Sequence, residues 1–526
     1  MGIELIKTET KSRRALGLLA GAACLALGAG AAQADMPLYS NGNLGVAGAL
    51  TTGFGVFAVP DANFGTGTYR STTGDVAARH TPEWGEGFVK PELKLTYHGD
   101  GGNTFFGDVS AIGAGSVGTG DGNSSTATSG HPAHFDLEEA YAGWAGDMPF
   151  GNPGDTAILT LGRQAFMVGD NFLIGSGTAN NGQRADYWLA PRNAFNGFGT
   201  LKLNADPVRA DVFLLQNSVD QHLTRGLDQP KTTFAGANVE YFITAAAAGS
   251  DGATNYADRQ FYVGATYFNI LDADSTGTSA SGAFSNTNAS NYGGSLASGA
   301  DRKGMNVYSF SFGGNPVSGP PVIANASLYG QYVREVNGSD GRKVDANAYY
   351  IEPGYTFSDW FGKPKFFYRY AHFSGDQNLG SISSSGTKHS YDPLFYSAGP
   401  RDYGSWYMGE ITGQYLLFNS NENVHLLGAS WTPDPKWKFM ALFYRFMLDQ
   451  PGQNGPTVTS NHFDDEVNLV AEYAYSSQTN FAFTVGAAQM ATGGKQTLNA
   501  NANNQANNRT AKTDTFVGEA SVIFNF

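Results

Sequence analysis

The stretch TDTFVGEASVIFNF at residues 513–526 alternates between apolar and polar positions. One parity carries Phe516, Gly518, Ala520, Val522, Phe524 and Phe526. The other carries Thr515, Glu519, Ser521 and Asn525, with Val517 and Ile523 as apolar exceptions. A period of two indicates a β-strand with one apolar face. Such a strand, ending on Phe with its apolar face outward, is typical of an outer-membrane β-barrel, although an edge strand of a soluble sheet shows the same period.

The composition of the 526-residue chain favours the barrel. Glycine, at 69 residues, and aromatic residues, at 13%, are abundant, while charged residues make up only 15%. A soluble domain usually has about a quarter of its residues charged. Strands that face lipid at every second position produce this mixture. The net charge of −14 and the lack of a basic run argue against nucleic acid as a partner.

The first 34 residues have the features of a cleaved signal peptide. Basic residues precede an apolar segment at residues 15–31, and residues 32–34 form an A-x-A cleavage site. We therefore expect a signal peptide at residues 1–34 and an outer-membrane barrel at residues 35–526. The alternative, a membrane anchor, lacks a charged flank after it. Cys24 is the only cysteine, so the mature chain is expected to use no disulfide or cysteine-bound metal.

Alternating segments recur along the rest of the chain, and no later run of 18 apolar residues would form a helical span. The segments are residues 43–59, 91–98, 104–112, 135–144, 157–166, 200–204, 208–216, 236–244, 259–270, 305–313, 324–335, 346–357, 365–373, 410–418, 424–432, 436–447, 466–476, 480–488 and 513–526. Long polar loops alternate with tight turns between them. This rhythm predicts an all-β, antiparallel up-and-down transmembrane barrel of about 18 strands, with short periplasmic turns and long extracellular loops. A soluble β-sandwich would share the strands but not the length, signal and loop rhythm together.

The strand faces give more detail. Val467 and Leu469 oppose Glu466 and Asn468, as expected for a lipid face and a lumen face. Residues 436–447 are apolar on both parities, so their orientation stays open. Aromatic residues at strand ends fit two girdles at the membrane interfaces. These are Tyr97, Trp144, Trp188, Trp431 and Trp437.

Charged strand residues are expected to face the lumen because lipid excludes them. Arginine matters most, since it binds carboxylates through two parallel hydrogen bonds and stays charged. The candidate pore-lining arginines are Arg163, Arg184, Arg192, Arg209, Arg334, Arg369, Arg401 and Arg445, and nearby acids include Asp186, Asp211, Glu352 and Glu410. Interleaved arginines and acids predict weak successive sites for anionic or sugar-like solutes. The alternative is that each arginine neutralises an acid and stiffens the wall.

Signals for an enzyme are weak. The histidines form no HExxH pattern, and the chain has no GxSxG. His131 and His134 fit a polar loop better than a metal site, and the acidic segments lack the spacing of a calcium loop. We expect no catalytic residue, cofactor or metal. A barrel enzyme, or a sheath around a partner protein, remains a third hypothesis behind the two channel functions given next.

Several short motifs resemble the alginate-export family of outer-membrane porins. They are Leu137-Glu138-Glu139-Ala140-Tyr141-Ala142-Gly143, Leu161-Gly162-Arg163-Gln164, Asp186-Tyr187-Trp188, Arg192-Asn193-Ala194-Phe195, Tyr368-Arg369-Tyr370-Ala371, Ser374-Gly375-Asp376, Gly409-Glu410 and Glu466-Val467-Asn468-Leu469. The resemblance is spread loosely over the mature chain, and general diffusion porins and maltoporin-like channels carry similar pieces.

Membership of this family would imply an 18-stranded barrel with an arginine-lined lumen that exports an anionic polysaccharide such as alginate. The resemblance implies lumen roles for Arg163 and Arg369, and weaker ones for Asp186 and Glu410. The alternative function is a general or nutrient-uptake diffusion porin for small solutes. Both functions place the chain in the Gram-negative outer membrane. Its partners would be outer-membrane lipid, the solute, and periplasmic export or assembly proteins.

Overall fold

The computed structural model describes most of residues 35–526. The described residues are 35–67, 81–118, 133–148, 151–152, 154–179, 189, 191–219, 231–243, 261–273, 302–316, 325–337, 343–377, 386–399, 401–500 and 510–526. The predicted signal peptide lies outside them. Among the described residues, no helix is both long and apolar enough to cross a membrane.

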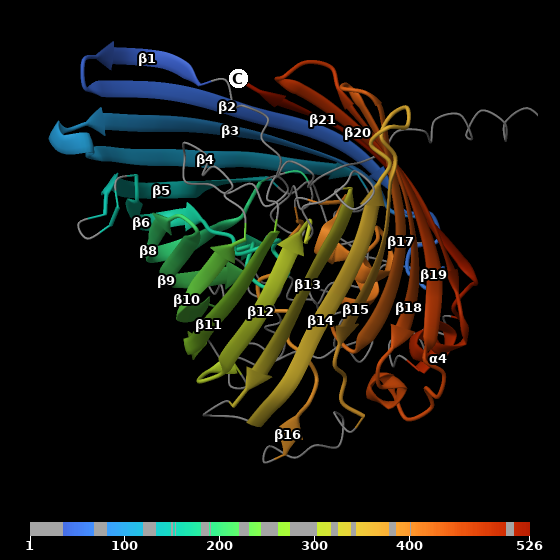
Figure 1. Ribbon diagram of the computed structural model, residues 1–526. Helices are drawn as coiled ribbons and strands as arrows, with labels where there is room; N and C mark the ends of the chain where they lie inside the picture. The colour runs from blue at the N-terminus through green and yellow to red at the C-terminus, as the bar shows by residue number, and fades with distance from the viewer. Residues whose placement is uncertain are drawn as a thin grey trace, which may run out of the picture.

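Eighteen of the described strands close into one antiparallel barrel (Figure 1). They are β2 (Leu44–Ala58), β3 (Glu83–His98), β4 (Thr104–Gly118), β5 (Ala133–Asp147), β6 (Thr156–Ala165), β8 (Ala194–Ala205), β9 (Val208–Val219), β10 (Lys231–Phe242), β11 (Phe261–Ala273), β12 (Asn306–Gly314), β13 (Ala326–Val336), β14 (Lys343–Thr356), β15 (Lys365–Phe373), β17 (Glu422–Asp434), β18 (Trp437–Leu448), β19 (His462–Ala474), β20 (Thr479–Met490) and β21 (Asp514–Asn525). The predicted fold class and the preferred strand number are confirmed.

The ring closes between its first and last strands. β21 pairs with the second half of β2, from Thr51 opposite Asn525 to Ala58 opposite Gly518. Leu50 and Phe526 exchange two backbone hydrogen bonds of 2.8 Å beyond that ladder. The short strand β1 (Met36–Asn41) pairs with the first half of β2 and so extends the line of β21. The two-residue strands β7 (Thr178–Ala179) and β16 (Thr387–Lys388) are not among the strands that close the barrel.

Side-chain exposure shows which parity faces outward. In β21, the side chain of Phe516 is 46% exposed, whereas Thr515 and Glu519 are buried. In β19, Val467 and Leu469 are exposed, while Glu466 is buried. The outward face is therefore apolar, as the alternation predicted, and the polar parity turns into the barrel. A continuous apolar outer wall with its polar residues inside is the arrangement of an outer-membrane barrel.

The two ends of the apolar wall are marked by different side chains. At the end with short turns, the Trp437 ring stacks on Tyr473 with ring centroids 4.4 Å apart. At the loop end, register places His425 beside Arg445 and Arg445 beside Asp465. The strand rises about 26 Å from Trp437 to Arg445 at ~3.3 Å per residue, or about 20 Å along the membrane normal at a tilt of ~40°. This length is close to that of an apolar band.

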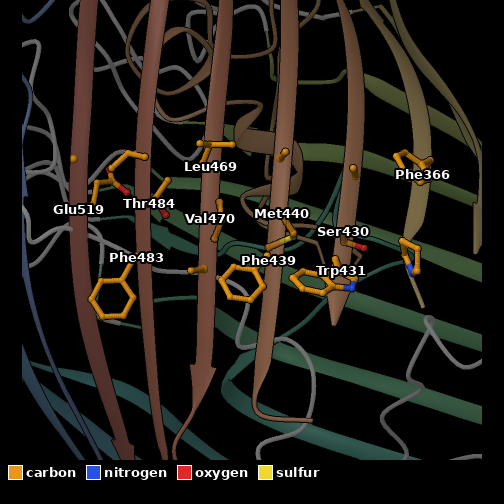
Figure 2. Close-up of a pocket in the computed structure, with 16 residues that line it drawn as sticks. Phe366, Ser430, Trp431, Phe439, Met440, Leu469, Val470, Phe483, Thr484 and Glu519 are labelled. Atoms are coloured by element: carbon orange, nitrogen blue, oxygen red, sulfur yellow. The ribbon is translucent and has the colours of Figure 1, made fainter. Parts of the chain in front are cut away.

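One hollow of about 540 Å³ lies on the wall formed by β15 and β17–β21. Figure 2 shows the rings of Phe483, Phe439 and Trp431 in a row across neighbouring strands, below Leu469. The exposed side chains that line it belong to the outward parity, and no residue of a loop inside the barrel lines it. The hollow therefore faces lipid acyl chains, and we do not consider it a solute site.

Two loop segments fold into the barrel and fill part of its lumen (Figure 1, behind β13–β15). They are residues 166–176, between β6 and β8, and residues 389–399 with 401–421, between β15 and β17; we call the second the luminal segment. Aromatic packing joins them, since the Phe172 and Trp406 ring centroids lie 4.7 Å apart. Both segments pack against Tyr350 of the wall, whose ring centroid lies 4.5 Å from that of Trp406 and 5.2 Å from that of Phe172.

The luminal segment corrects one predicted strand. Residues 410–418 form a single π-helical turn at Gly413–Leu417 with its flanks, and they are buried on every side. Their alternation resembles that of a wall strand, but both parities pack inside the barrel. The same packing resolves residues 436–447: Phe443 faces outward, while Leu442 and Tyr444 face inward against the buried interior. Both faces of this strand are apolar because one faces lipid and the other packs against the filled interior of the barrel.

Candidate functional site

Arg369 and Arg401 form the centre of a buried ion-pair network, which we call the clamp. Glu352, on β14, lies between them: Arg369 Nε donates to Glu352 Oε2 at 2.7 Å, and Arg401 Nη1 lies 3.0 Å from Glu352 Oε1. Arg369 Nη2 also lies 3.0 Å from Asp402 Oδ1. Arg401 Nη2 donates to Asp170 Oδ2 at 2.6 Å. The clamp therefore joins two wall strands, the luminal segment and residues 166–176.

Aromatic rings cover the two guanidinium groups of the clamp. Arg369 Cζ lies 4.4 Å from the Trp406 ring centroid, and Arg401 Cζ lies 4.2 Å from that of Tyr329. Burial alone would raise the pKa of Asp402, but the Arg369 guanidinium holds it below its usual value. Such a network is stable only while each charge keeps its partner. For Arg369 and Arg401, the wall-stiffening alternative describes the geometry best.

Arg209, near the short-turn end of the barrel, is buried and paired with an acid, as the two arginines of the clamp are. Its Nη2 donates to Asp211 Oδ1 at 3.3 Å, and both residues are buried on the inner face of β9. Asn238 Nδ2 on β10 donates to Asp211 Oδ2 at 3.3 Å and to Glu240 Oε1 at 3.2 Å. Arg209 thus belongs to a cross-strand polar network that ties β9 to β10.

The predicted wall residue Glu410 lies in the luminal segment, where it is buried and not on a strand. Glu466 of β19 holds this part of the segment by accepting backbone N–H groups from Glu410 at 2.7 Å, Ile411 at 3.1 Å and Thr412 at 2.9 Å. Burial and the charge of Glu466 raise the pKa of the Glu410 carboxyl to about 8. We call this contact the Glu466 anchor. It fixes the luminal segment to the inner wall at β19.

Arg163 and Arg192 lie elsewhere, beside Glu138 of β5: Arg163 is on β6, and Arg192 precedes the start of β8. Both approach Glu138: Arg192 Nε lies 3.0 Å from Glu138 Oε2, and Arg163 Nη2 lies 3.5 Å from the same oxygen. Arg192 Nη1 also lies 2.8 Å from Asp136 Oδ2. Arg163 Nη1 donates to the amide oxygen of Asn196. We call Asp136, Glu138, Arg163 and Arg192 the wall cluster.

Two backbone irregularities shape the wall around the wall cluster. Ser110 pairs with Glu139 and Ala111 with Leu137, so Glu138 is the extra residue of a β-bulge. Two consecutive glutamates, Glu138 and Glu139, consequently point inward. On β6, Gly162 has φ of +123°, and a Cβ there would lie 2.3 Å from the Ala140 carbonyl oxygen. Glycine is required at this position.

A second set of charges continues the wall cluster toward the periplasmic end. Lys90 Nζ lies 2.8 Å from Glu139 Oε2 and 3.8 Å from Glu92 Oε2. Lys94 Nζ lies 3.1 Å from Glu92 Oε1 and 2.9 Å from Asp35 Oδ1. Unlike the clamp, these groups stay partly accessible: the side chain of Lys94 is 30% exposed, that of Asp136 27% and that of Glu139 17%. Together with the wall cluster they form what we call the charged track.

Four predicted site residues fall outside this arrangement. Arg334 is on the outward parity of β13, where its side chain is 50% exposed and pairs with Asp345 at 2.9 Å, so its predicted role in lining the pore is wrong. Arg445 is on the outward parity of β18, where its side chain is 48% exposed and pairs with Asp465 at 2.7 Å, so its predicted role in lining the pore is wrong. It lies at the loop end of the apolar band, where an outward charge meets water and headgroups. Arg184 and Asp186 lie outside the described residues.

Other charged residues were not singled out by the sequence. Lys90, Asp136 and Glu139 line the inner wall, and Arg302 binds Asp392 of the luminal segment through two hydrogen bonds of 2.6 and 2.7 Å. Strict alternation in PELKLTYH, residues 91–98, does place Glu92 and Lys94 inward, so parity offered a signal for part of the track. In the described part of the chain, no group of three or more His, Cys, Asp or Glu side chains is arranged to hold a metal ion.

Comparison with known proteins supports the fold and no particular family. No family model and no curated protein matches the chain. The crystal structure of OccAB4 from Acinetobacter baumannii superimposes with a TM-score of 0.50 and 10% identity, covering 92% of this chain and 98% of that one. OccD3 (OpdP) from Pseudomonas aeruginosa gives 0.49, 10% identity and coverage of 97% and 95%. OpdK with vanillate, from the same species, gives 0.48, 9% identity and coverage of 91% and 98%.

At 10% identity, the similarity to OccAB4 shows a shared barrel fold and nothing more about the chain. Since no family model matches, the resemblance to the alginate-export family gains no support. The function must therefore be argued from the lumen itself.

Proposed function

We propose that the protein is a passive outer-membrane channel for the uptake of small polar solutes. In this proposal, solutes pass along the charged track on the inner wall of β3–β8. Arg163 and Arg192 offer weak binding to anionic or sugar-like groups as the solute moves past. The observation that carries the proposal is that the Lys94 and Asp136 side chains of the track are 30% and 27% exposed, whereas those of the clamp are at most 4% exposed.

The luminal segment favours small solutes over a polysaccharide. The clamp, the Arg302–Asp392 pair and the Glu466 anchor hold the segment at separate points inside the barrel. Moving it aside for a polymer would break several buried ion pairs, each of which costs about 3–5 kcal/mol when one partner is lost. We therefore prefer nutrient uptake to alginate export, which becomes the less favoured hypothesis.

The proposal is tested with purified protein in liposomes and planar bilayers. We expect small sugars and carboxylates to enter protein-containing liposomes faster than empty ones, and ion current to persist when uronate oligomers are added. Failure of every small solute to enter would refute a channel function. Strong block of the ion current by uronate oligomers, together with transport of these oligomers, would favour polysaccharide export instead.

Two variants test whether solutes pass along the charged track. Arg163→Gln combined with Arg192→Gln removes positive charge from the track, and we expect weaker permeation of carboxylates. Arg445→Gln removes one positive charge from the outward face and serves as the control, because it lies outside the lumen. An equal effect of both variants would argue against a passage along this wall.

A further inference from the structure

We propose that the charged track favours zwitterionic solutes, such as amino acids, over solutes of net negative charge. The inference rests on the proposed function and specifies the substrate class of the same passage. It follows from the alternation of opposite charges along one wall and from their shared exposure. An arginine-lined wall alone would instead favour anions.

The wall cluster presents both signs of charge at one place. Arg192 Nη1 and Asp136 Oδ2 are 2.8 Å apart, with side chains 8% and 27% exposed, and the neighbouring Arg163 side chain is 14% exposed. The β-bulge at Glu138 adds Glu139 to the same inward face. A solute at this point therefore meets a guanidinium and a carboxylate within one molecular length.

The same arrangement recurs one step toward the periplasm. Lys90 and Glu139 are 2.8 Å apart, with side chains 13% and 17% exposed. Lys94 follows between Glu92 and Asp35. Each accessible ammonium or guanidinium of the track is thus accompanied by at least one carboxylate within 3.5 Å.

Opposite electrostatic contributions cancel for a singly charged solute. Two unit charges contribute a term that is favourable for opposite signs and unfavourable, by a similar amount at the same distance, for like signs. A monoanion near an arginine–aspartate pair gains one such term and loses a similar one, so little attraction remains. A zwitterion that lies antiparallel to the pair gains both terms, because its carboxylate meets the guanidinium while its ammonium meets the carboxylate. Successive mixed pairs would pass such a solute from one to the next.

The test compares three solutes of nearly equal size in proteoliposomes: alanine, lactate and 1-amino-2-propanol. We expect labelled alanine to enter severalfold faster than either singly charged solute. Faster entry of lactate than alanine, or equal rates for all three, would overturn the zwitterion inference while leaving the channel intact. Entry of none of them would instead refute the proposed function.

Two variants sharpen the test, with a heat-modifiable shift in gel mobility as the check of barrel assembly. Asp136→Asn is expected to slow alanine and speed lactate. Arg192→Gln should slow alanine and speed 1-amino-2-propanol. Arg445→Gln, on the outward face, should leave the order of the three solutes unchanged. If both track variants keep the wild-type order, the mixed-charge track does not select the solute.

Discussion

The buried clamp makes a quantitative prediction about Glu352. This carboxylate contacts Arg369 at 2.5 and 2.7 Å and Arg401 at 3.0 Å, and all three side chains are at most 4% exposed. Glu352→Gln leaves two buried guanidinium groups without their shared negative charge. Breaking a buried pair in this way costs about 3–5 kcal/mol. With a denaturant slope of about 3 kcal/mol/M, the urea midpoint should fall by about 1 to 1.7 M.

The control is an ion pair of similar geometry on the outside. Arg445 donates to Asp465 at 2.7 and 3.0 Å, but the two side chains are 48% and 28% exposed. Asp465→Asn should therefore change the unfolding free energy by less than about 1 kcal/mol. Tryptophan fluorescence during urea titration in lipid vesicles measures both variants. Equal shifts of the two midpoints would refute the reasoning that burial, and not pairing alone, makes the clamp strong.

Three further predictions concern loop position, pH and selectivity. Gly409→Ala places a Cβ 2.6 Å from Glu466 Oε1 at φ of +88°, so it should loosen the Glu466 anchor and give larger, noisier single-channel currents. The pKa of Glu410 is raised from 4.5 to about 8, so its contribution to stability is full below pH 4.5 and is lost as pH rises through 8. The free energy of unfolding from urea titrations should therefore be lower at pH 9 than at pH 5, and Glu410→Gln should reduce this difference. Gly162→Ala should displace the bulge and Arg163, and change solute preference in bilayer recordings without preventing assembly.

The fold could be predicted from the sequence because lipid imposes a local rule. Every second residue of a wall strand faces acyl chains, so the parity of short segments such as residues 513–526 is sufficient. The rule fails at residues 410–418, where an alternating segment lies inside the barrel. Sequence parity cannot distinguish a strand with a lipid face from a segment that is buried on all sides.

The candidate site was predicted only in part, for two physical reasons. Parity assumes an uninterrupted strand, whereas the bulge at Glu138 turns two neighbouring glutamates inward. The roles of the arginines depend on contacts between distant parts of the chain, as between Arg401 and Asp170, 231 residues apart in sequence. Whether an inward arginine binds a loop or stays accessible therefore follows from loop placement. Arg445 was misplaced because outward charges are tolerated beyond the apolar band.

The account rests on a water-filled passage along the charged track, and thiol labelling tests this most directly. Cys24, in the predicted signal peptide, is the only cysteine of the chain, so single cysteines can be introduced without background. Glu139→Cys places a thiol on the track, and Ser309→Cys places one on the buried inner face of β12. A charged, membrane-impermeant thiol reagent added during planar-bilayer recording should lower the current of Glu139→Cys and leave Ser309→Cys unchanged. Block of Ser309→Cys with no effect on Glu139→Cys would contradict the passage we propose.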